Sequence, residues 1–312
     1  MNGSPMPNLL VLVGPTASGK TVTAIQLAEA LDGEIISADS RYLYQELNIG
    51  TAKPTSEELA RVPHHLINVT TLDKPWSLGV YQKAAHQLIE QVNSRGHLPI
   101  LAGGTGQYIR AITENWQIPA QAPNHQLRDA IEMWGKRIGF EALHQRLARL
   151  DPEAAQLIDY RNKRRTIRAL EVIFTTGQRF SEQRKKVAPA CHQLIVGITL
   201  PRELLYEQID ARIEAMFAAG LIDEVQGLVE QGYAETLKQM GIIGYCEVLQ
   251  YLEGQCSLEE AKQLIRHNTR VFVRRQANWF KANDPKIHWF NATDPAMLAH
   301  MLDLINATFT KA

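Results

Sequence analysis

The sequence predicts an α/β protein built on a doubly wound parallel sheet, with a mostly helical inserted domain and a helical C-terminal region. Two observations lead to this fold class. Apolar runs of strand length alternate with helical patterns in the first third of the chain, which is typical of a parallel sheet covered by helices on both faces. The first run also leads directly into a glycine-rich loop that opens a helix. We expect the core to cover residues 1–115 and 190–312, and the insertion to cover residues 116–189.

The first apolar run, Leu9–Val13, ends at a glycine and is typical of a short buried strand. The glycines that follow allow backbone N–H groups to point inward, a lysine adds positive charge, and a threonine hydroxyl can bind a phosphate-associated Mg²⁺. A chance match is the alternative, but the flanking strand and helix argue against it. The fold is therefore predicted to be P-loop NTPase-like, with a diphosphate or polyphosphate as ligand. Eight residues match the Gly-x-x-x-x-Gly-Lys-Thr pattern: Gly14, Pro15, Thr16, Ala17, Ser18, Gly19, Lys20 and Thr21.

Composition narrows the class of protein. A chain of 312 residues with 45% hydrophobic and 21% charged residues is ordinary for a globular protein of one large or two smaller domains. No apolar run approaches the roughly 18 residues that cross a bilayer, and the first residues lack a leader pattern, so we expect a cytoplasmic protein with no membrane partner. The three cysteines are widely spaced, which predicts reduced thiols.

Further apolar runs extend the predicted sheet. Strands are expected within the run Glu34–Ser40 and at His65–Val69 and Leu98–Ala102, with a helix over Tyr81–Val92 between the last two. Because ligands gather at the carboxyl ends of parallel strands, Asp39 is expected beside the phosphate loop if its strand lies next to the first strand.

The strand at Leu98–Ala102 ends unusually for a P-loop protein. In ordinary P-loop ATPases the corresponding strand ends in an aspartate that helps to hold Mg²⁺, whereas this strand runs into Gly103-Gly104-Thr105-Gly106. Asp39 is better placed to accept a proton from a nucleophile than to complete a metal site. Both roles stay open from the residues alone.

The insertion carries an excess of positive charge. Between Arg161 and Lys186 it has nine basic residues against two acidic ones, Glu171 and Glu182, a local charge of about +7 in a chain whose formal net charge is zero. We interpret this segment as an electrostatic footprint for a nucleic-acid backbone, with a solvated helical face as the alternative. Helices are predicted over Leu127–Ile138, Phe140–Leu150, Ala154–Ile158 and Asn162–Thr175. The basic residues are Arg161, Lys163, Arg164, Arg165, Arg168, Arg179, Arg184, Lys185 and Lys186.

After the insertion the chain is predicted to rejoin the sheet at Leu194–Leu200 and then to form a helix that carries Arg212. The guanidinium of Arg212 can reach back to a bound phosphate or pair with Glu207 or Glu214 on the surface, and the sequence favours neither.

Residues 221–284 again show helical patterns, which a turn interrupts at residues 241–245. Within them Arg266, Arg270 and Arg274 recur every four residues on one helical face. The tail, residues 291–312, is predicted as an amphipathic helix.

Several strings, taken in order and spacing, resemble the isopentenyl-diphosphate:tRNA transferase family over residues 8–290. They are Gly14–Thr21, Ser37–Tyr42 with Ile49–Pro54, Gly103–Gly106, Arg164–Glu171 and Gly244–Tyr245. The resemblance implies an enzyme that transfers a dimethylallyl group from dimethylallyl diphosphate to N6 of the adenine 3′-adjacent to the tRNA anticodon. The adenine is flipped out of the loop for the reaction. Diphosphate then leaves from the P-loop, which agrees with the missing strand-end aspartate.

The resemblance also implies roles for single residues. Asp39 is expected as general base and Thr105 as the residue that orients the amine or the diphosphate, while Lys20 and Arg212 stabilise the leaving group. Residues Gly14–Thr21 bind the diphosphate, and Thr21 binds the cofactor Mg²⁺. Partners are dimethylallyl diphosphate and the tRNA anticodon stem-loop, and the protein is expected to be a monomer. Contacts to tRNA are expected from Asp39, Ser40, Arg41, Tyr42, Thr105, Arg128, Arg164, Arg165, Thr166, Ile167, Arg168, Gly241, Ile242, Ile243, Gly244, Tyr245 and Cys246.

Two other functions fit parts of the sequence. A nucleotide isopentenyltransferase or a P-loop small-molecule kinase uses the same loop, but it leaves the basic insertion and the second helical region without a purpose. An RNA-binding P-loop protein with weak NTPase activity uses both features without any group transfer.

Overall fold

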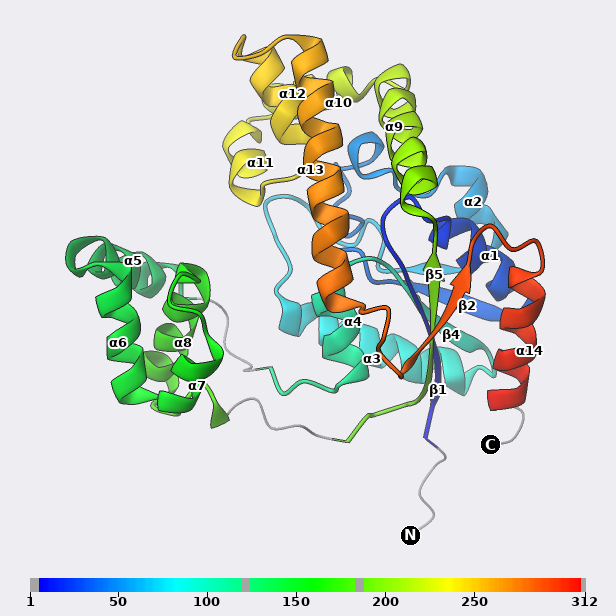
Figure 1. Cartoon of the computed structure of the whole chain (residues 1–312), viewed down its shortest axis with the longest axis horizontal. Helices are drawn as coiled ribbons and strands as arrows, with labels where there is room; N and C mark the ends of the chain where they lie inside the picture. The colour runs from blue at the N-terminus through cyan, green and yellow to red at the C-terminus, as the bar shows by residue number, and fades with distance from the viewer. Residues whose placement is uncertain (1–5, 119–123, 183–187, 310–312) are drawn as a thin grey trace. The chain divides into compact units, whose positions relative to one another are not determined.

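The structure is a computed structural model of the 312-residue chain and describes residues 6–118, 124–182 and 188–309. Within these ranges one sheet contains six strands, all parallel, in the order β3-β2-β4-β1-β5-β6 (Figure 1). The predicted doubly wound parallel sheet is confirmed. Arg184, Lys185 and Lys186 of the basic insertion lie outside the described residues. The strands are β1 Asn8–Val13, β2 Gly33–Ser37, β3 His64–His65, β4 Leu98–Ala102, β5 His192–Thr199 and β6 Ile287–Asn291.

Strand β1 lies at the centre of the sheet because its side chains are apolar on both faces. Residues 9–13 are fully buried, and Leu10 pairs with Ile100 of β4 on one side and with Leu194 of β5 on the other. Such a continuous apolar run is typical of a strand with helices above and below. The phosphate-binding loop therefore leaves the sheet from its middle.

Helices cover both faces of this sheet (Figure 1). Helices α1 and α14 share a hydrophobic cluster with β1, β4 and β5. On α3, Tyr81 stacks on Tyr108 of α4 and donates a hydrogen bond to the carbonyl of Ser37 at the end of β2. The helices outside the insertion are α1 Lys20–Leu31, α2 Ser56–Arg61, α3 Leu78–Ser94, α4 Gly106–Thr113, α9 Arg202–Ala218, α10 Leu221–Glu230, α11 Ala234–Met240, α12 Tyr245–Leu252, α13 Leu258–Trp279 and α14 Met297–Phe309, with a short 3₁₀ turn η1 at Ile49–Thr51.

Two strands differ from the sequence prediction. The strand expected at His65–Val69 ends after His65, because Leu66 and Asn68 have φ of 61° and 58°, in the left-handed region, which an extended strand cannot accommodate. The tail expected to be helical from residue 291 begins with the last residue of β6, and α14 starts only at Met297. Strand β6 went unpredicted because Ile287 alone of its five residues is buried, so it lacks a clear apolar run.

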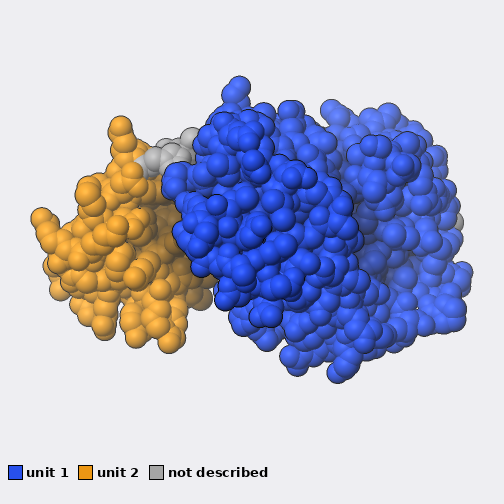
Figure 2. Space-filling view, turned by 90° about the horizontal axis from the view of Figure 1, so that it is seen from above, with its two compact units in different colours: residues 1–76, 80–113, 190–312 blue, residues 77–79, 114–189 orange. Residues whose placement is uncertain are grey.

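The chain divides into two compact units, coloured separately in Figure 2. Unit 1 comprises residues 1–76, 80–113 and 190–312 and contains the sheet. Unit 2 comprises residues 77–79 and 114–189 and has its own hydrophobic cluster, in which Leu143, Leu147 and Leu170 are fully buried. Its helices are α5 His125–Ile138, α6 Phe140–Leu150, α7 Pro152–Leu157 and α8 Lys163–Thr176. In the described residues of both units, no helix combines the length and apolar character that a membrane span requires.

A buried carboxylate joins the helices of unit 2. Glu171 on α8 is 1% exposed and accepts hydrogen bonds from Arg128 on α5 at 2.7 Å, from Arg168 at 2.8 Å and from the backbone N–H of Asn124 at 2.9 Å. Burial works to raise the pKa of Glu171, but the hydrogen bonds from Arg168 and Arg128 outweigh it and lower the pKa. Arg128 and Arg168, which the sequence analysis assigned to tRNA, are thus paired with a carboxylate of their own unit.

We expect Glu171→Gln to loosen unit 2 by about 3 kcal/mol, because removing one partner of a buried ion pair leaves the other partners uncompensated. Hydrogen exchange of the α8 amides measures this local stability. Exchange should be about 100-fold faster in the variant near pH 7. Since the pKa is lowered in the fold, the stabilisation is present above the ordinary carboxyl pKa and is lost as the pH falls through the lowered value.

Glu141→Gln on the exposed face of α6 serves as the matched control and should leave the exchange of α8 unchanged. Equal protection of α8 in both variants contradicts the assigned role of Glu171.

Candidate active site

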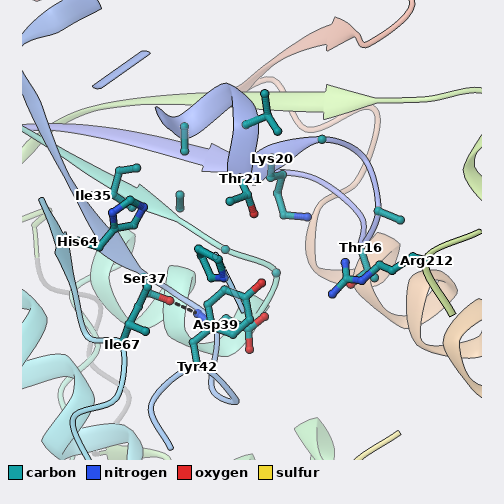
Figure 3. A pocket seen from close by; sticks show the side chains of 18 residues that line it. Thr16, Lys20, Thr21, Ile35, Ser37, Asp39, Tyr42, His64, Ile67 and Arg212 are labelled. Atoms are coloured by element: carbon teal, nitrogen blue, oxygen red, sulfur yellow. Dashed lines mark hydrogen bonds between the residues drawn. The ribbon is translucent and has the colours of Figure 1, made fainter. Parts of the chain in front are cut away.

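A cavity of about 190 Å³ lies at the carboxyl ends of β1, β2 and β4 (Figure 3). Segments that are distant in sequence form its walls: the P-loop after β1, Ser37 and Asp39 at the end of β2, Gly103 and Gly104 after β4, and Arg212 of α9. Asp39 lines the same cavity as the P-loop, as expected, but the expected pairing of its strand with β1 is wrong, because β4 lies between β2 and β1. All of these residues belong to unit 1.

The P-loop backbone needs its glycines. A Cβ atom at Gly14 would lie 2.9 Å from the carbonyl oxygen of Ile198 on β5, and Gly19 has φ of 87°, in the left-handed region. Helix α1 begins directly afterwards at Lys20, so its first free N–H groups and its positive dipole end point toward the loop. The loop can therefore bind an anion through its backbone.

Lys20 and Arg212 bring two cationic groups to this cavity. Burial, with a smaller contribution from the Arg212 charge, lowers the pKa of Lys20 to about 7, although the Asp39 charge works in the opposite direction. The Lys20 ammonium donates a hydrogen bond to the Pro15 carbonyl, and Arg212 donates one to the Thr51 carbonyl at 2.9 Å. Figure 3 shows both side chains directed into the same space.

The position of Arg212 bears on the two roles that the sequence left open for it. Glu214 binds Lys262 and Arg266 of α13 instead, while Arg212 lines the cavity beside Lys20. The position therefore favours contact with a bound phosphate over a surface ion pair.

Asp39 and Thr105 lie on adjacent segments. One Asp39 carboxylate oxygen accepts a hydrogen bond from the Arg41 N–H at 2.8 Å, and the Thr105 hydroxyl oxygen accepts one from the Ser40 N–H at 3.0 Å. A Cβ atom at Gly103 would lie 2.3 Å from the Ala38 backbone, so only glycine permits this approach. The segments that follow β2 and β4 therefore lie side by side.

The string Ile49–Pro54 was recognised in the sequence, but its structural role was not. Its carbonyl groups anchor two cavity residues: the Tyr42 hydroxyl donates to Ala52 at 2.8 Å, and Arg212 donates to Thr51. The Glu224 carboxylate holds the string in place by accepting the N–H groups of Ile49 and Gly50. Burial and the Asp39 charge raise the pKa of Tyr42, so its hydroxyl stays protonated.

The residues assigned to tRNA in unit 2 occupy different environments. Arg164 and Arg165 are exposed on α8, whereas Arg128 and Arg168 bind Glu171. Thr166 and Ile167 are 1% and 9% exposed, and Ile167 belongs to the hydrophobic cluster. The expected side-chain contacts from Thr166 and Ile167 are therefore not available in this structure, because both side chains lie on the inner face of α8.

The residues assigned to tRNA in the turn before α12 are likewise partly buried and partly exposed. Ile242 and Tyr245 are buried, and the Tyr245 hydroxyl donates to Glu224 at 2.5 Å, so contact through these side chains is likewise not available. Gly241 is exposed, while Ile243 and Cys246 are partly buried. The Arg41 guanidinium donates to the Met240 carbonyl at 3.0 Å and joins this turn to the segment after β2.

Fold and cavity together define a P-loop α/β protein whose pocket brings Lys20, Arg212 and the carboxylate of Asp39 together. A family model described as IPP transferase matches residues 42–283, most of the chain. The chain therefore belongs to the IPP transferase family, and the family resemblance of the sequence is confirmed.

Curated relatives and solved structures agree with this assignment. The tRNA dimethylallyltransferase of Thermomicrobium roseum is 46% identical over 287 residues, which cover 92% of this chain and 87% of the relative. That of Roseiflexus castenholzii is 47% identical over 301 residues, with 96% and 98% covered. The full-length tRNA isopentenylpyrophosphate transferase of Bacillus halodurans has a TM-score of 0.72 at 35% identity, with 98% and 97% covered. A eukaryotic dimethylallyltransferase acting on tRNA has a TM-score of 0.80 at 25% identity, with 98% and 77% covered.

We expect inorganic pyrophosphate to bind with proton uptake by Lys20. Above pH 7 the Lys20 amine of the free protein is largely neutral, because its pKa is about 7, and a bound polyanion raises that pKa. Calorimetric titration at pH 8 in buffers of different ionisation enthalpy measures the protons taken up.

Lys20→Arg is the matched control, since a guanidinium keeps its proton at pH 8. The wild type should take up more protons per bound pyrophosphate than this variant. The same proton count in both proteins contradicts the assignment.

Proposed function

We propose that this protein transfers a dimethylallyl group from dimethylallyl diphosphate to N6 of the adenine 3′-adjacent to the anticodon of tRNA and releases diphosphate. One observation carries the proposal: Lys20, Arg212 and the P-loop line the same cavity as Asp39, whose neighbour Ser40 donates a hydrogen bond to Thr105. The segment after β4 has glycines and a threonine where an ATPase has a carboxylate. Membership of the IPP transferase family supports the same reaction.

The cationic end of the cavity suits a departing diphosphate. As the allylic carbon–oxygen bond breaks, negative charge grows on the diphosphate, and groups that bind this charge stabilise the transition state more than the ground state. Arg212, held by the Thr51 carbonyl, supplies a permanent charge. Lys20, with its pKa of about 7, gains a proton readily as that charge develops.

Asp39 suits the role of general base. The exocyclic amine of adenine is a weak nucleophile that becomes acidic as it attacks the allylic carbon, so a carboxylate within reach can take its proton. One Asp39 oxygen is fixed by the Arg41 N–H, which orients the other. The Thr105 oxygen accepts the Ser40 N–H. Its hydroxyl group can form a further hydrogen bond that orients the adenine amine or the diphosphate.

The residues present fit Mg²⁺ as a cofactor that the substrate helps to hold. Within residues 6–118, 124–182 and 188–309 no group of three His, Cys, Asp or Glu side chains forms a metal site. The Thr21 hydroxyl lines the cavity, and together with diphosphate oxygens it provides the oxygen ligands that Mg²⁺ prefers. When bound, the ion neutralises charge on the leaving diphosphate.

For tRNA we propose that Arg164 and Arg165 contact phosphates, because both are exposed. Asp39–Tyr42, Thr105 and the turn at Gly241–Cys246 then receive the flipped adenine and its neighbours. We also propose that the protein acts as a monomer in the cytoplasm.

Transfer of labelled dimethylallyl groups tests the proposal. The protein is incubated with dimethylallyl diphosphate labelled in the allyl group, together with unmodified tRNA, AMP and ATP. The proposal expects label in the tRNA. Label in AMP supports a nucleotide isopentenyltransferase, and ATP hydrolysis without label transfer supports an RNA-binding NTPase.

Asp39→Asn should slow transfer by a factor of about 10³ while tRNA binding stays within about threefold, because the amide keeps the hydrogen bond from Arg41 but cannot accept the proton. Single-turnover rates and filter binding measure the two quantities. Asp73→Asn, outside the cavity, is the control. Turnover of Asp39→Asn at the wild-type rate removes Asp39 from the role of base.

Replacing Arg164 and Arg165 by Gln should weaken tRNA binding and reduce the slope of log K against log salt by about 2, roughly one for each lost phosphate contact. Arg146 and Arg149 are also exposed in unit 2 and form a matched control pair on α6, which should change the slope less. Identical slopes for wild type and Arg164/Arg165 variant indicate that these arginines only solvate the helix.

A further inference from the structure

Helix α13 reaches the catalytic loops through one buried amide. Gln276 is 4% exposed, and its Oε1 accepts the backbone N–H of Thr16 in the P-loop at 2.9 Å. Its Nε2 donates to the carbonyl of Gly104, next to Thr105, at 3.1 Å. A single side chain thus spans the loop that binds diphosphate and the loop that carries Thr105.

The surroundings of Gln276 leave it little freedom. A Cβ atom at Gly104 would lie 2.4 Å from Nε2 of Gln276, and a Cβ atom at Gly106 would lie 2.2 Å from the Trp279 ring. Arg110 of α4 donates to the Trp279 carbonyl at 2.9 Å. The end of α13 is therefore packed directly on the segment after β4.

The same helix is also fixed to α9, which carries Arg212. Arg270 binds Asp210 at 2.7 Å, and Arg266 and Lys262 bind Glu214. These charges explain the four-residue spacing of Arg266 and Arg270. Asp210 and Glu214 lie two residues before and after Arg212, so α13 sets the position of the helix that supplies the second cation.

We propose that Gln276 is a positioning residue that holds the diphosphate loop and the Thr105 loop at the separation that transfer requires. This inference rests on the proposed function. The two loops bind the two ends of the reaction, the leaving oxygen and the attacking amine, and a misplacement of about 1 Å between reacting groups costs roughly 100-fold in rate. Only an uncharged side chain with one acceptor and one donor satisfies both loops here.

The test uses the full chain with Gln276→Met, which keeps the length of the side chain and removes both hydrogen-bonding groups. Its single-turnover transfer rate, per folded molecule, should fall by about 30-fold, while tRNA binding changes by less than about threefold because Gln276 contacts no residue assigned to tRNA side-chain recognition. Circular dichroism gives the folded fraction. Hydrogen exchange of the Thr16 amide should become faster, since its acceptor is lost.

A second variant, Gln276→Glu, adds a pH readout. The ionised carboxylate places an acceptor against the Gly104 carbonyl, whereas the protonated carboxyl offers the donor and acceptor of the native amide. Burial favours the protonated form. The rate of this variant relative to wild type should therefore rise as the pH falls from 8.5 to 6, which a role confined to stability does not produce.

Gln263→Met and Gln263→Glu on the exposed face of α13 are the matched controls and should behave as wild type. Wild-type transfer per folded molecule in Gln276→Met, or unchanged Thr16 exchange, overturns the positioning role. A wild-type chain that transfers no label to tRNA refutes the proposed function instead, and the Thr16 exchange measurement still reports whether Gln276 holds the loop.

Discussion

The site depends on three parallel strands that end level with one another. Ala102 of β4 pairs with Leu12 of β1 on one side and with Ser37 of β2 on the other. The chain therefore leaves all three strands at the same edge, with the P-loop, the Asp39 segment and the Gly103–Gly106 segment as neighbours. Antiparallel pairing would place one of these segments at the opposite edge, and the cavity would lose a wall.

The electrostatics of the cavity follow from burial at this edge. Burial and the Arg212 charge lower the pKa of Lys20 to about 7, so Lys20 gives up its proton far more readily than an ordinary lysine, which reduces the repulsion with Arg212 in the free protein. When a polyanion binds, the same lysine can take up a proton, so the positive charge of the cavity increases on binding. Other arginines are paired with carboxylates, as Arg270 with Asp210 and Arg168 with Glu171 show.

Sequence reasoning succeeded where the local backbone dictates the outcome. The P-loop and β4 could be predicted because an apolar run followed by fixed glycines permits few conformations. The sequence could not predict features that depend on contacts between residues far apart in the chain. The role of Arg212 depends on Glu214 being occupied by α13, and the hydrogen bond of Gln276 to Thr16 joins residues 260 positions apart. Thr166 and Ile167 match a family string, but both lie on the buried face of α8, which the apolar periodicity of this helix indicates.

The central claim is that the P-loop holds a departing diphosphate beside a carboxylate that accepts a proton. A crystal structure of the protein with a dimethylallyl diphosphate analogue whose allylic bond cannot break tests it most directly. The account predicts the diphosphate against the loop Gly14–Thr21, within ion-pair distance of Lys20 and Arg212, and the allylic carbon on the side of Asp39. A diphosphate bound elsewhere, or an allyl group directed away from Asp39, would contradict the account.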